Sequence, residues 1–184
     1  MKNSIQFYVL LVAVVFGGVK WTAHSILEKK KAVLEKTNFN TEIQKALVAN
    51  GEPELAAQVK GKTVVLYDWN KYCDHCLKEL PQLNKLAAEH PGVQFIGVTN
   101  IEKLETEAYL KSKKITMNFP QVEEKNDWRN GLMIPIAPVY AEESQEKGPD
   151  SGKPVVLIID GNGKVKWCTG GERKNLVEEI RKAI

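Results

Sequence analysis

Two short apolar runs on either side of one amphipathic segment constrain the fold more than any other feature of this chain. Residues 63–67 (TVVLY) and 93–98 (VQFIGV) are apolar and rich in β-branched side chains, which is typical of buried strands. Between them, five apolar residues recur at helical spacing: Leu77, Leu80, Leu83, Leu86 and Ala87. A strand, a helix and a second strand in this order form a right-handed unit with two parallel strands. The chain is therefore predicted to be an α/β protein.

The pattern after residue 98 extends this unit. Residues 102–114 are predicted to form the next helix, whereas residues 115–153 show no long period. Four prolines and a polar run over residues 142–152 interrupt this second stretch. We therefore expect an inserted loop over 115–153 with one or two short elements. A loop of this length in a compact domain commonly has a functional role.

Regular patterning returns at Pro154. Residues 155–159 (VVLII) and 164–169 are predicted strands joined by the tight turn 160–163, which makes an antiparallel hairpin. A closing helix follows, and its apolar face is formed by Leu176, Val177, Ile180 and Ile184. The predicted fold of residues 61–184 is therefore a central mixed sheet flanked by helices.

Residues 25–60 form a predicted helical lead-in to this domain. Their pattern is polar and helical, with a first helix that ends near Glu35. Asn40 and Thr41 are the predicted cap of a second helix that runs to Val48.

The chain starts with an apolar segment, residues 5–23, that contains one charged residue, Lys20. Its uncharged part ends before Lys20 and is shorter than the roughly 20 residues of a full membrane span, although Trp21 extends it at the interface. Residues 1–24 are therefore predicted to be either an uncleaved signal anchor in the inner membrane or a cleaved signal peptide.

The side of the membrane on which the domain lies is predicted from two opposed arguments. Lys20 and the lysines at 29–31 favour a cytoplasmic domain when positive charges are counted. A short N-terminal apolar segment, in contrast, usually directs the following chain outward. We predict an exported domain, which is single-pass and periplasmic or extracytoplasmic if the segment is retained, and secreted if it is cleaved.

Charge and cysteine content exclude two classes of protein. The chain has 26 basic and 23 acidic residues, a net charge of +3, and this balance predicts no nucleic-acid partner. Three cysteines are too few for a dense disulfide scaffold. They divide into one close pair and Cys168, which we interpret as a small packing residue of the final strand.

The close pair lies in NKYCDHCLKELP, residues 70–81, and three uses of it are open. A structural zinc site needs four ligands, usually from two such pairs, and the chain has no second pair. A structural disulfide over so short a loop restricts the unfolded chain little. Redox exchange fits the position of Cys73, where a strand turns into a helix whose dipole favours a thiolate.

The two residues between the cysteines act in opposite directions on that thiolate. His75 stabilises a thiolate at Cys73 when its imidazole is protonated, and Asp74 opposes it. A more stable thiolate makes the disulfide more oxidising. The dipeptide therefore leaves the direction of electron flow open.

The run WNKYCDHCLKELP, residues 69–81, resembles the active-site segment of thioredoxin-like proteins. Its C-x-x-C-x-x-E-x-P spacing is similar to that of the membrane-anchored TlpA/ResA branch. Gly61–Lys62 before the first strand, and residues 152–154 with the hairpin after them, resemble that branch too. The resemblance covers about 61–184 at both ends, with the middle loop unmatched, and implies a thioredoxin-like fold.

This resemblance implies roles for four residues. Cys73 is the exposed attacking thiol, and Cys76 is the buried resolving thiol. Pro154 is the cis-proline that abuts the disulfide and presents backbone to an extended substrate, with an ordinary strand-opening proline as the alternative. Glu79 is an acid that tunes the titration of the cysteines, with a solvated helix glutamate as the alternative.

Three further residues are predicted to contact substrate: Lys153, Trp69 and Tyr72. The chain also departs from the family pattern, since Tyr72 replaces the usual tryptophan before the first cysteine. Tyr67 stands where thioredoxin has a buried aspartate, and Asp68 follows on the opposite face of the strand. We therefore do not expect Asp68 to be the proton acceptor.

Together these features predict a thiol:disulfide oxidoreductase whose only redox group is the Cys73–Cys76 disulfide, with no metal and no other cofactor. The resemblance implies reduction of partner proteins, such as apocytochrome c thiols in cytochrome maturation, with electrons from a membrane donor protein. Three alternatives are a disulfide-forming oxidant of the DsbA kind, a non-enzymatic adaptor that binds partners through residues 115–153, and a metallochaperone that carries copper(I) on two thiolates.

Overall fold

The computed structural model describes residues 32, 33, 35–124 and 154–184. Within it, Thr37–Ile184 form a compact unit. The expectations for residues 1–31 and 125–153, which include the apolar segment and most of the inserted loop, lie outside the described residues. Among the residues that are described, no helix combines the length and the apolar character that crossing a membrane requires.

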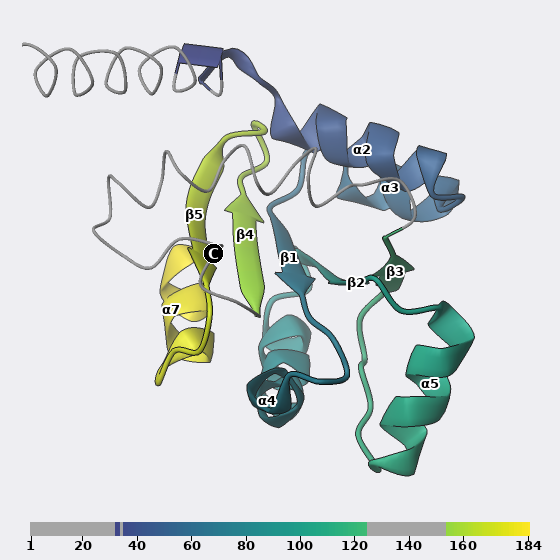
Figure 1. The fold of residues 1–184 in the computed structure, drawn as a ribbon. Coiled ribbons are helices and arrows are strands. Elements are labelled where there is room, and N and C mark those ends of the chain that lie inside the picture. Colours follow the sequence, from purple (N-terminus) through teal and green to yellow (C-terminus); the bar gives the residue numbers. More distant parts are fainter. Residues whose placement is uncertain (1–31, 34, 125–153) are drawn as a thin grey trace, which may run out of the picture. The chain divides into compact units, whose positions relative to one another are not determined.

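A five-stranded sheet with the order β3-β2-β1-β4-β5 forms the centre of this unit (Figure 1). The strands are β1 (Val64–Asp68), β2 (Gln94–Thr99), β3 (Gln121–Glu123), β4 (Val155–Ile159) and β5 (Val165–Gly170). β2 is parallel to β1 and to β3, whereas β4 is antiparallel to β1 and to β5. This arrangement confirms the predicted mixed sheet, with the strand–helix–strand unit on one side and the hairpin on the other.

The two central strands, β1 and β4, are buried along their whole length. Burial on both faces explains why their sequences are continuous apolar runs rather than alternating ones. In their register Val64 pairs with Ile159 and Asp68 pairs with Val155. The carboxyl end of β1 therefore lies beside the start of β4.

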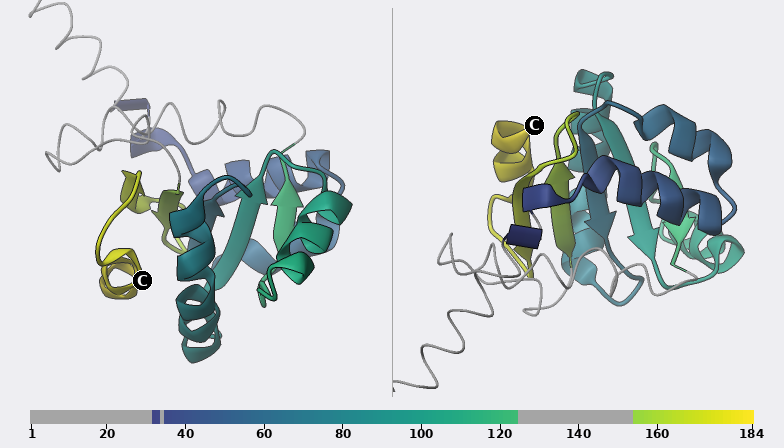
Figure 2. Two further views of the ribbon diagram at one scale, coloured as in Figure 1. Left: turned by 60° about the horizontal axis from the view of Figure 1, so that its bottom comes forward. Right: turned by 90° about the horizontal axis from the view of Figure 1, so that it is seen from above.

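Helices cover both faces of the sheet (Figure 2). On one face, apolar residues of α4, α5 and α7 form a buried cluster with Val65 and Tyr67 of β1. On the other face lie α2 and α3 (Figure 2). The helices are α2 (Phe39–Ala49), α3 (Pro53–Val59), α4 (Asp74–Glu89), α5 (Lys103–Ser112) and α7 (Leu176–Ala183).

The start of α2 differs from the prediction. Asn38 is the N-cap, and its side chain accepts a hydrogen bond from the backbone N–H of Thr41 at 3.0 Å. The predicted cap at Asn40 was wrong, because this side chain is buried and donates to the carbonyl of Val59 at 2.9 Å. Asn40 thus ties α2 to the end of α3, a tertiary contact that a local capping pattern does not reveal.

One short element of the inserted loop is described, the edge strand β3. Its Val122 is buried and pairs with Val98 of β2. Three residues are too few to show an alternating pattern, so the sequence placed this strand in a loop.

The turn between β4 and β5 holds the start of α2. The carbonyl of Gly163 accepts a hydrogen bond from the backbone N–H of Phe39 at 2.8 Å. Gly163 has a φ of 80°, and a Cβ there would lie 2.1 Å from Oδ1 of Asn38. This position therefore requires glycine both for its backbone conformation and for the close approach of α2.

Candidate active site

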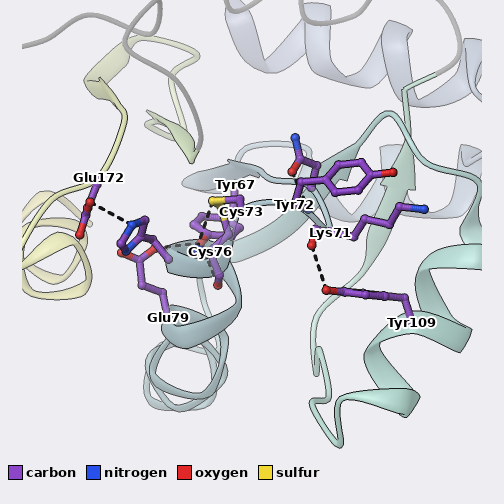
Figure 3. Close-up of a disulfide and its surroundings, with 10 residues drawn as sticks. Tyr67, Lys71, Tyr72, Cys73, Cys76, Glu79, Tyr109 and Glu172 are labelled. Carbon is purple, nitrogen blue, oxygen red and sulfur yellow. Dashed lines mark hydrogen bonds and ion pairs between the residues drawn. A yellow bond between two sulfur atoms is a disulfide. The ribbon is translucent and has the colours of Figure 1, made fainter.

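The cysteine pair lies where β1 ends and α4 begins. Cys73 is the N-cap of α4, and it forms a disulfide with Cys76 in the first turn, with a Cα–Cα distance of 5.2 Å. The Sγ atom of Cys73 also accepts a hydrogen bond from the backbone N–H of Cys76 at 3.2 Å (Figure 3). The amide of Cys76 is one of the first-turn amides that have no acceptor within the helix, and it faces this sulfur together with the positive end of the helix dipole. Both favour the thiolate after reduction.

The two cysteines differ in exposure. Cys73 is partly exposed, whereas Cys76 is fully buried in the cluster between α4 and the sheet. A partner protein can therefore approach the first sulfur, and the second is shielded. This difference matches the order of action that the sequence resemblance implied for the two thiols.

Glu79 lies one helical turn after Cys76 and is held by Tyr67 of β1 (Figure 3). The buried Tyr67 hydroxyl donates to Oε2 of Glu79 at 2.9 Å and lies 3.2 Å from the carbonyl oxygen of Cys76. Burial raises the pKa of the Glu79 carboxyl, and the hydrogen bond from Tyr67 and the nearby His75 oppose this rise. The arrangement places an acid with an elevated pKa beside the resolving cysteine.

The pKa of Tyr67 is itself raised well above its ordinary value, first by burial and then by the charge of Glu79. Tyr67 therefore stays protonated and acts as a hydrogen-bond donor. Asp68 is buried too, and it alternates with Tyr67 in step with Val64 and Leu66, buried apolar residues of β1 outside the cluster, as expected for the opposite face. In this chain a tyrosine and a glutamate occupy the region where the family resemblance suggested a buried aspartate.

His75 points toward the turn that follows β5. Its Nε2 lies 2.9 Å from Oε2 of Glu172, and the two side chains are 42% and 62% exposed. Asp74, the other residue between the cysteines, is exposed in the first turn of α4. The two residues predicted to tune the thiolate therefore differ, because among the described residues His75 has an ion-pair partner from a distant part of the chain and Asp74 has none.

The segment between β1 and α4 is braced by polar contacts. The Asn70 side chain accepts a hydrogen bond from the backbone N–H of Tyr72 at 2.9 Å, and the hydroxyl of Tyr109 on α5 donates to the carbonyl of Lys71 at 2.9 Å (Figure 3). Lys71 also forms an ion pair with Glu105 of α5. These contacts fix the backbone that leads to Cys73.

The predicted substrate contacts have different environments. Tyr72 is 81% exposed next to Cys73, so its ring is open to a partner. Trp69 is fully buried in the cluster on the α4 face, so its side chain presents no surface in this structure. Pro154 is buried directly before β4, and its carbonyl accepts from the backbone N–H of Gly171 at 2.9 Å. Lys153 lies outside the described residues.

The register of the sheet brings Pro154 to the same end as the cysteines. Since Asp68 pairs with Val155, Pro154 lies at the end of β4 that faces the segment from β1 to α4. Its cis conformation and its contact with substrate remain predictions from the resemblance.

Three members of the site carried no signal in the sequence: the hydroxyl contact of Tyr67, the ion pair of Glu172, and the brace from Tyr109. Each depends on side chains that meet from different elements of the fold, and the sequence showed beforehand only that Tyr67 departs from the family pattern. In the described parts of the chain, no group of three or more His, Cys, Asp and Glu side chains is placed to hold a metal ion.

Comparison with known proteins identifies the family. A profile described as the AhpC/TSA family matches residues 37–168. The chain belongs to the AhpC/TSA family. The thiol-disulfide oxidoreductase ResA of Bacillus cereus is 27% identical to it over 190 residues, which cover 100% of this chain and 98% of the relative.

Two further relatives are more distant or more local. The soluble secreted antigen MPT53 of Mycobacterium bovis is 38% identical over 53 residues, which are 29% of this chain and 31% of the relative. The crystal structure of a putative thiol:disulfide interchange protein DsbE from Chlorobium tepidum superposes with a TM-score of 0.50 at 21% identity, over 70% of this chain and 81% of that chain. This last likeness concerns the fold alone.

The family, the ResA relatives and the cysteine pair at disulfide distance agree with one another. The protein is a thiol-disulfide oxidoreductase of the ResA/TlpA kind with a thioredoxin-like fold. This confirms the resemblance drawn from the sequence.

Proposed function

We propose that this protein is an exported, membrane-tethered reductase of disulfides in partner proteins. The observation that carries the proposal is the pair of sulfurs with unequal exposure, a partly exposed Cys73 at the helix N-terminus and a buried Cys76. The name of its ResA relatives, thiol-disulfide oxidoreductase, is in accord with this chemistry.

In the proposed reaction, the Cys73 thiolate attacks one sulfur of a partner disulfide and forms a mixed disulfide, while the other partner sulfur leaves as a thiolate. Cys76 then attacks the Cys73 sulfur, which forms the intramolecular disulfide and releases the second partner thiol. The partner gains two electrons and two protons, and the enzyme ends in the disulfide form seen in the structure. Glu79, one helical turn after Cys76, is the proposed acceptor of the proton that Cys76 loses.

The cycle closes when a membrane protein with a reduced dithiol returns the two electrons to the disulfide. The proposed substrate is a disulfide of apocytochrome c, which is reduced to two thiols in cytochrome maturation. No further cofactor is needed, because the two cysteines carry both electrons.

A trapping experiment tests the exchange mechanism. Cys76→Ser leaves the attacking thiol and removes the resolving one, so a covalent complex with partner proteins should accumulate and disappear on treatment with dithiothreitol. Cys73→Ser is the matched control and should trap nothing, because Cys76 is buried. Equal trapping by both variants, or by neither in the native cells, would contradict the proposal.

The direction of electron flow is tested by the reduction potential. A value near about −270 mV, as in thioredoxin, supports a reductase, whereas a value near about −120 mV, as in DsbA, supports a disulfide-forming oxidant.

The location is tested separately by cell fractionation and intact mass. The full chain in an alkali-washed membrane fraction supports an anchor, and a chain shortened near residue 24 supports a cleaved signal peptide.

A further inference from the structure

Glu172 is a residue outside every motif of the sequence, and the turn after β5 brings it to the cysteine pair. Gly171 has a φ of 78°, and its backbone N–H donates to the carbonyl of Pro154 at 2.9 Å. This bond ties the turn to the start of β4, at the end of the sheet where the cysteines lie. Glu172 follows directly and reaches His75, with 2.9 Å between Oε2 and Nε2 (Figure 3).

The imidazole of His75 is directed to this carboxylate and not to the sulfurs. Within the described residues, no hydrogen bond joins His75 to Cys73 or to Cys76. Glu172 itself lies apart from Cys73 and Cys76, on the segment that follows β5 (Figure 3). The ring therefore has a partner that competes with the sulfur of Cys73 for its orientation.

We propose that Glu172 is a positioning residue that holds His75 away from Cys73 and thereby makes the disulfide less oxidising. The inference rests on the proposed exchange at Cys73 and Cys76, and it adds the residue that decides how the histidine of the C-D-H-C sequence acts. A histidine cation next to the first thiolate stabilises the reduced enzyme. Paired with Glu172, the same side chain is directed away from the sulfur, and this favours a protein that gives electrons to its partners.

Other charged and titratable groups around the pair are Asp74 on the same helix turn, Glu79 one turn later, Tyr67 on β1 and Lys71 before the helix. All of these stay in place when Glu172 alone is changed. Glu172 also interacts electrostatically with Glu79 and raises the pKa of that carboxyl, so Glu172→Gln acts on both His75 and Glu79, and the two effects have to be separated.

The test is the equilibrium between the full-length protein, kept in detergent micelles, and glutathione. In this reaction the enzyme disulfide and two glutathione thiols give the enzyme dithiol and one glutathione disulfide, and the fraction of each form is read by alkylation and mass. For Glu172→Gln, the equilibrium constant for reduction should rise about two- to fivefold, the range of exposed charge interactions. This corresponds to a potential about 9 to 21 mV more oxidising.

A double-mutant cycle separates positioning from a general effect of charge. In the His75→Asn background, the additional change Glu172→Gln should alter the equilibrium constant less than about twofold, because there is no imidazole to release. Glu178→Gln, which removes a carboxylate of similar exposure on α7, is the matched control and should leave the constant unchanged. The alkylation rate of Cys73 at mildly acidic pH should increase in the single variant Glu172→Gln, and not in the double variant with His75→Asn or in Glu178→Gln.

Three results would overturn the inference: no change in Glu172→Gln, a less oxidising disulfide, or the same increase with and without His75. The last would mean that Glu172 acts through its own charge. The proposed function is judged on other data, the absolute potential of the wild-type protein and the Cys76→Ser trap. A strongly oxidising wild-type protein would refute the reductase proposal and would still leave the Glu172 difference measurable.

Discussion

Removal of the Tyr67 hydroxyl tests the electrostatic arrangement around the resolving cysteine. In Tyr67→Phe, the half-buried carboxylate of Glu79 loses a donor at 2.9 Å, and the carbonyl of Cys76 loses a weaker contact at 3.2 Å. One hydroxyl proton serves one acceptor at a time, so the shorter contact to the charged group dominates. The variant therefore isolates one hydrogen bond to Glu79.

The size of the effect follows from the environment of that bond. Hydrogen bonds to charged groups contribute about 1.5–3 kcal/mol to stability. At a half-buried carboxylate, water can replace part of the lost bond. We therefore expect Tyr67→Phe to lower the free energy of unfolding by about 1–2 kcal/mol at neutral pH. Since the bond favours the ionised carboxyl, the pKa of Glu79, already above its ordinary value of 4.5, should rise further. A change of about 1.4 kcal/mol corresponds to an increase of about one pH unit.

The sign of the pH dependence is fixed by the same bond. A group whose pKa is raised on folding binds more protons in the native state, so stability falls as the pH rises through the window from 4.5 to the folded pKa. Tyr67→Phe extends this window upward, and its loss of stability should be largest above the folded pKa and small below 4.5. Urea unfolding at several pH values, followed by the fluorescence of the buried Trp69, measures the stability, and a carbon-13 titration of the Glu79 carboxyl measures its pKa.

Tyr109→Phe is the matched control, because its hydroxyl donates to the neutral carbonyl of Lys71 at the same distance of 2.9 Å. We expect a loss of about 0.5–1.5 kcal/mol that does not depend on pH, and no change in the titration of Glu79. An unchanged or lowered pKa of Glu79 in Tyr67→Phe, or equal pH dependence in the two variants, would refute the assignment of Tyr67 as the donor to an ionised carboxylate.

Two further predictions concern the frame around the site. Burial raises the pKa of the Cys168 thiol to about 12. This thiol should therefore resist iodoacetamide at neutral pH in the folded, reduced protein and react only after denaturation. Mass spectrometry after labelling measures the modification, and rapid labelling of Cys168 in the native protein would refute the prediction. Gly163→Ala places a Cβ 2.1 Å from Oδ1 of Asn38 at a φ of 80°, and should cost more than about 1 kcal/mol in a urea melt. Gly92→Ala, where a Cβ meets nothing within 4 Å, is its control and should have a much smaller effect.

The sheet and the position of the cysteines were predictable because each depends on a local pattern. The continuous apolar runs of β1 and β4 follow from burial on both faces, and the helical spacing after Cys76 follows from one face packed on the sheet. The strand-to-helix transition then places Cys73 at a helix N-terminus without reference to the rest of the chain. One or two short elements were predicted in the inserted loop, but the three-residue β3 was not located, because its formation depends on pairing with β2 rather than on its own sequence.

The arrangement around the cysteines was only partly predictable. Glu79 was recognised by its spacing from Cys76, but the sequence does not say that a tyrosine hydroxyl from β1 reaches it. The ion pair of His75 with Glu172 requires the path of the turn after β5, which is set by a glycine with positive φ and a bond to the carbonyl of Pro154. Contacts of this kind form through tertiary structure, so one sequence leaves them open.

The place of β4 in the sheet has a consequence for the order in which the chain folds. β1 lies between β2, which follows it closely, and β4, which begins at Val155 after the inserted loop. Until the last part of the chain is available, one edge of β1 is unpaired, and the amide of Phe39 lacks its acceptor on Gly163. Pairing over such a separation closes slowly. The final hairpin therefore supplies the strand that covers this edge of β1, and the start of that strand lies at the end of the sheet where the cysteines are.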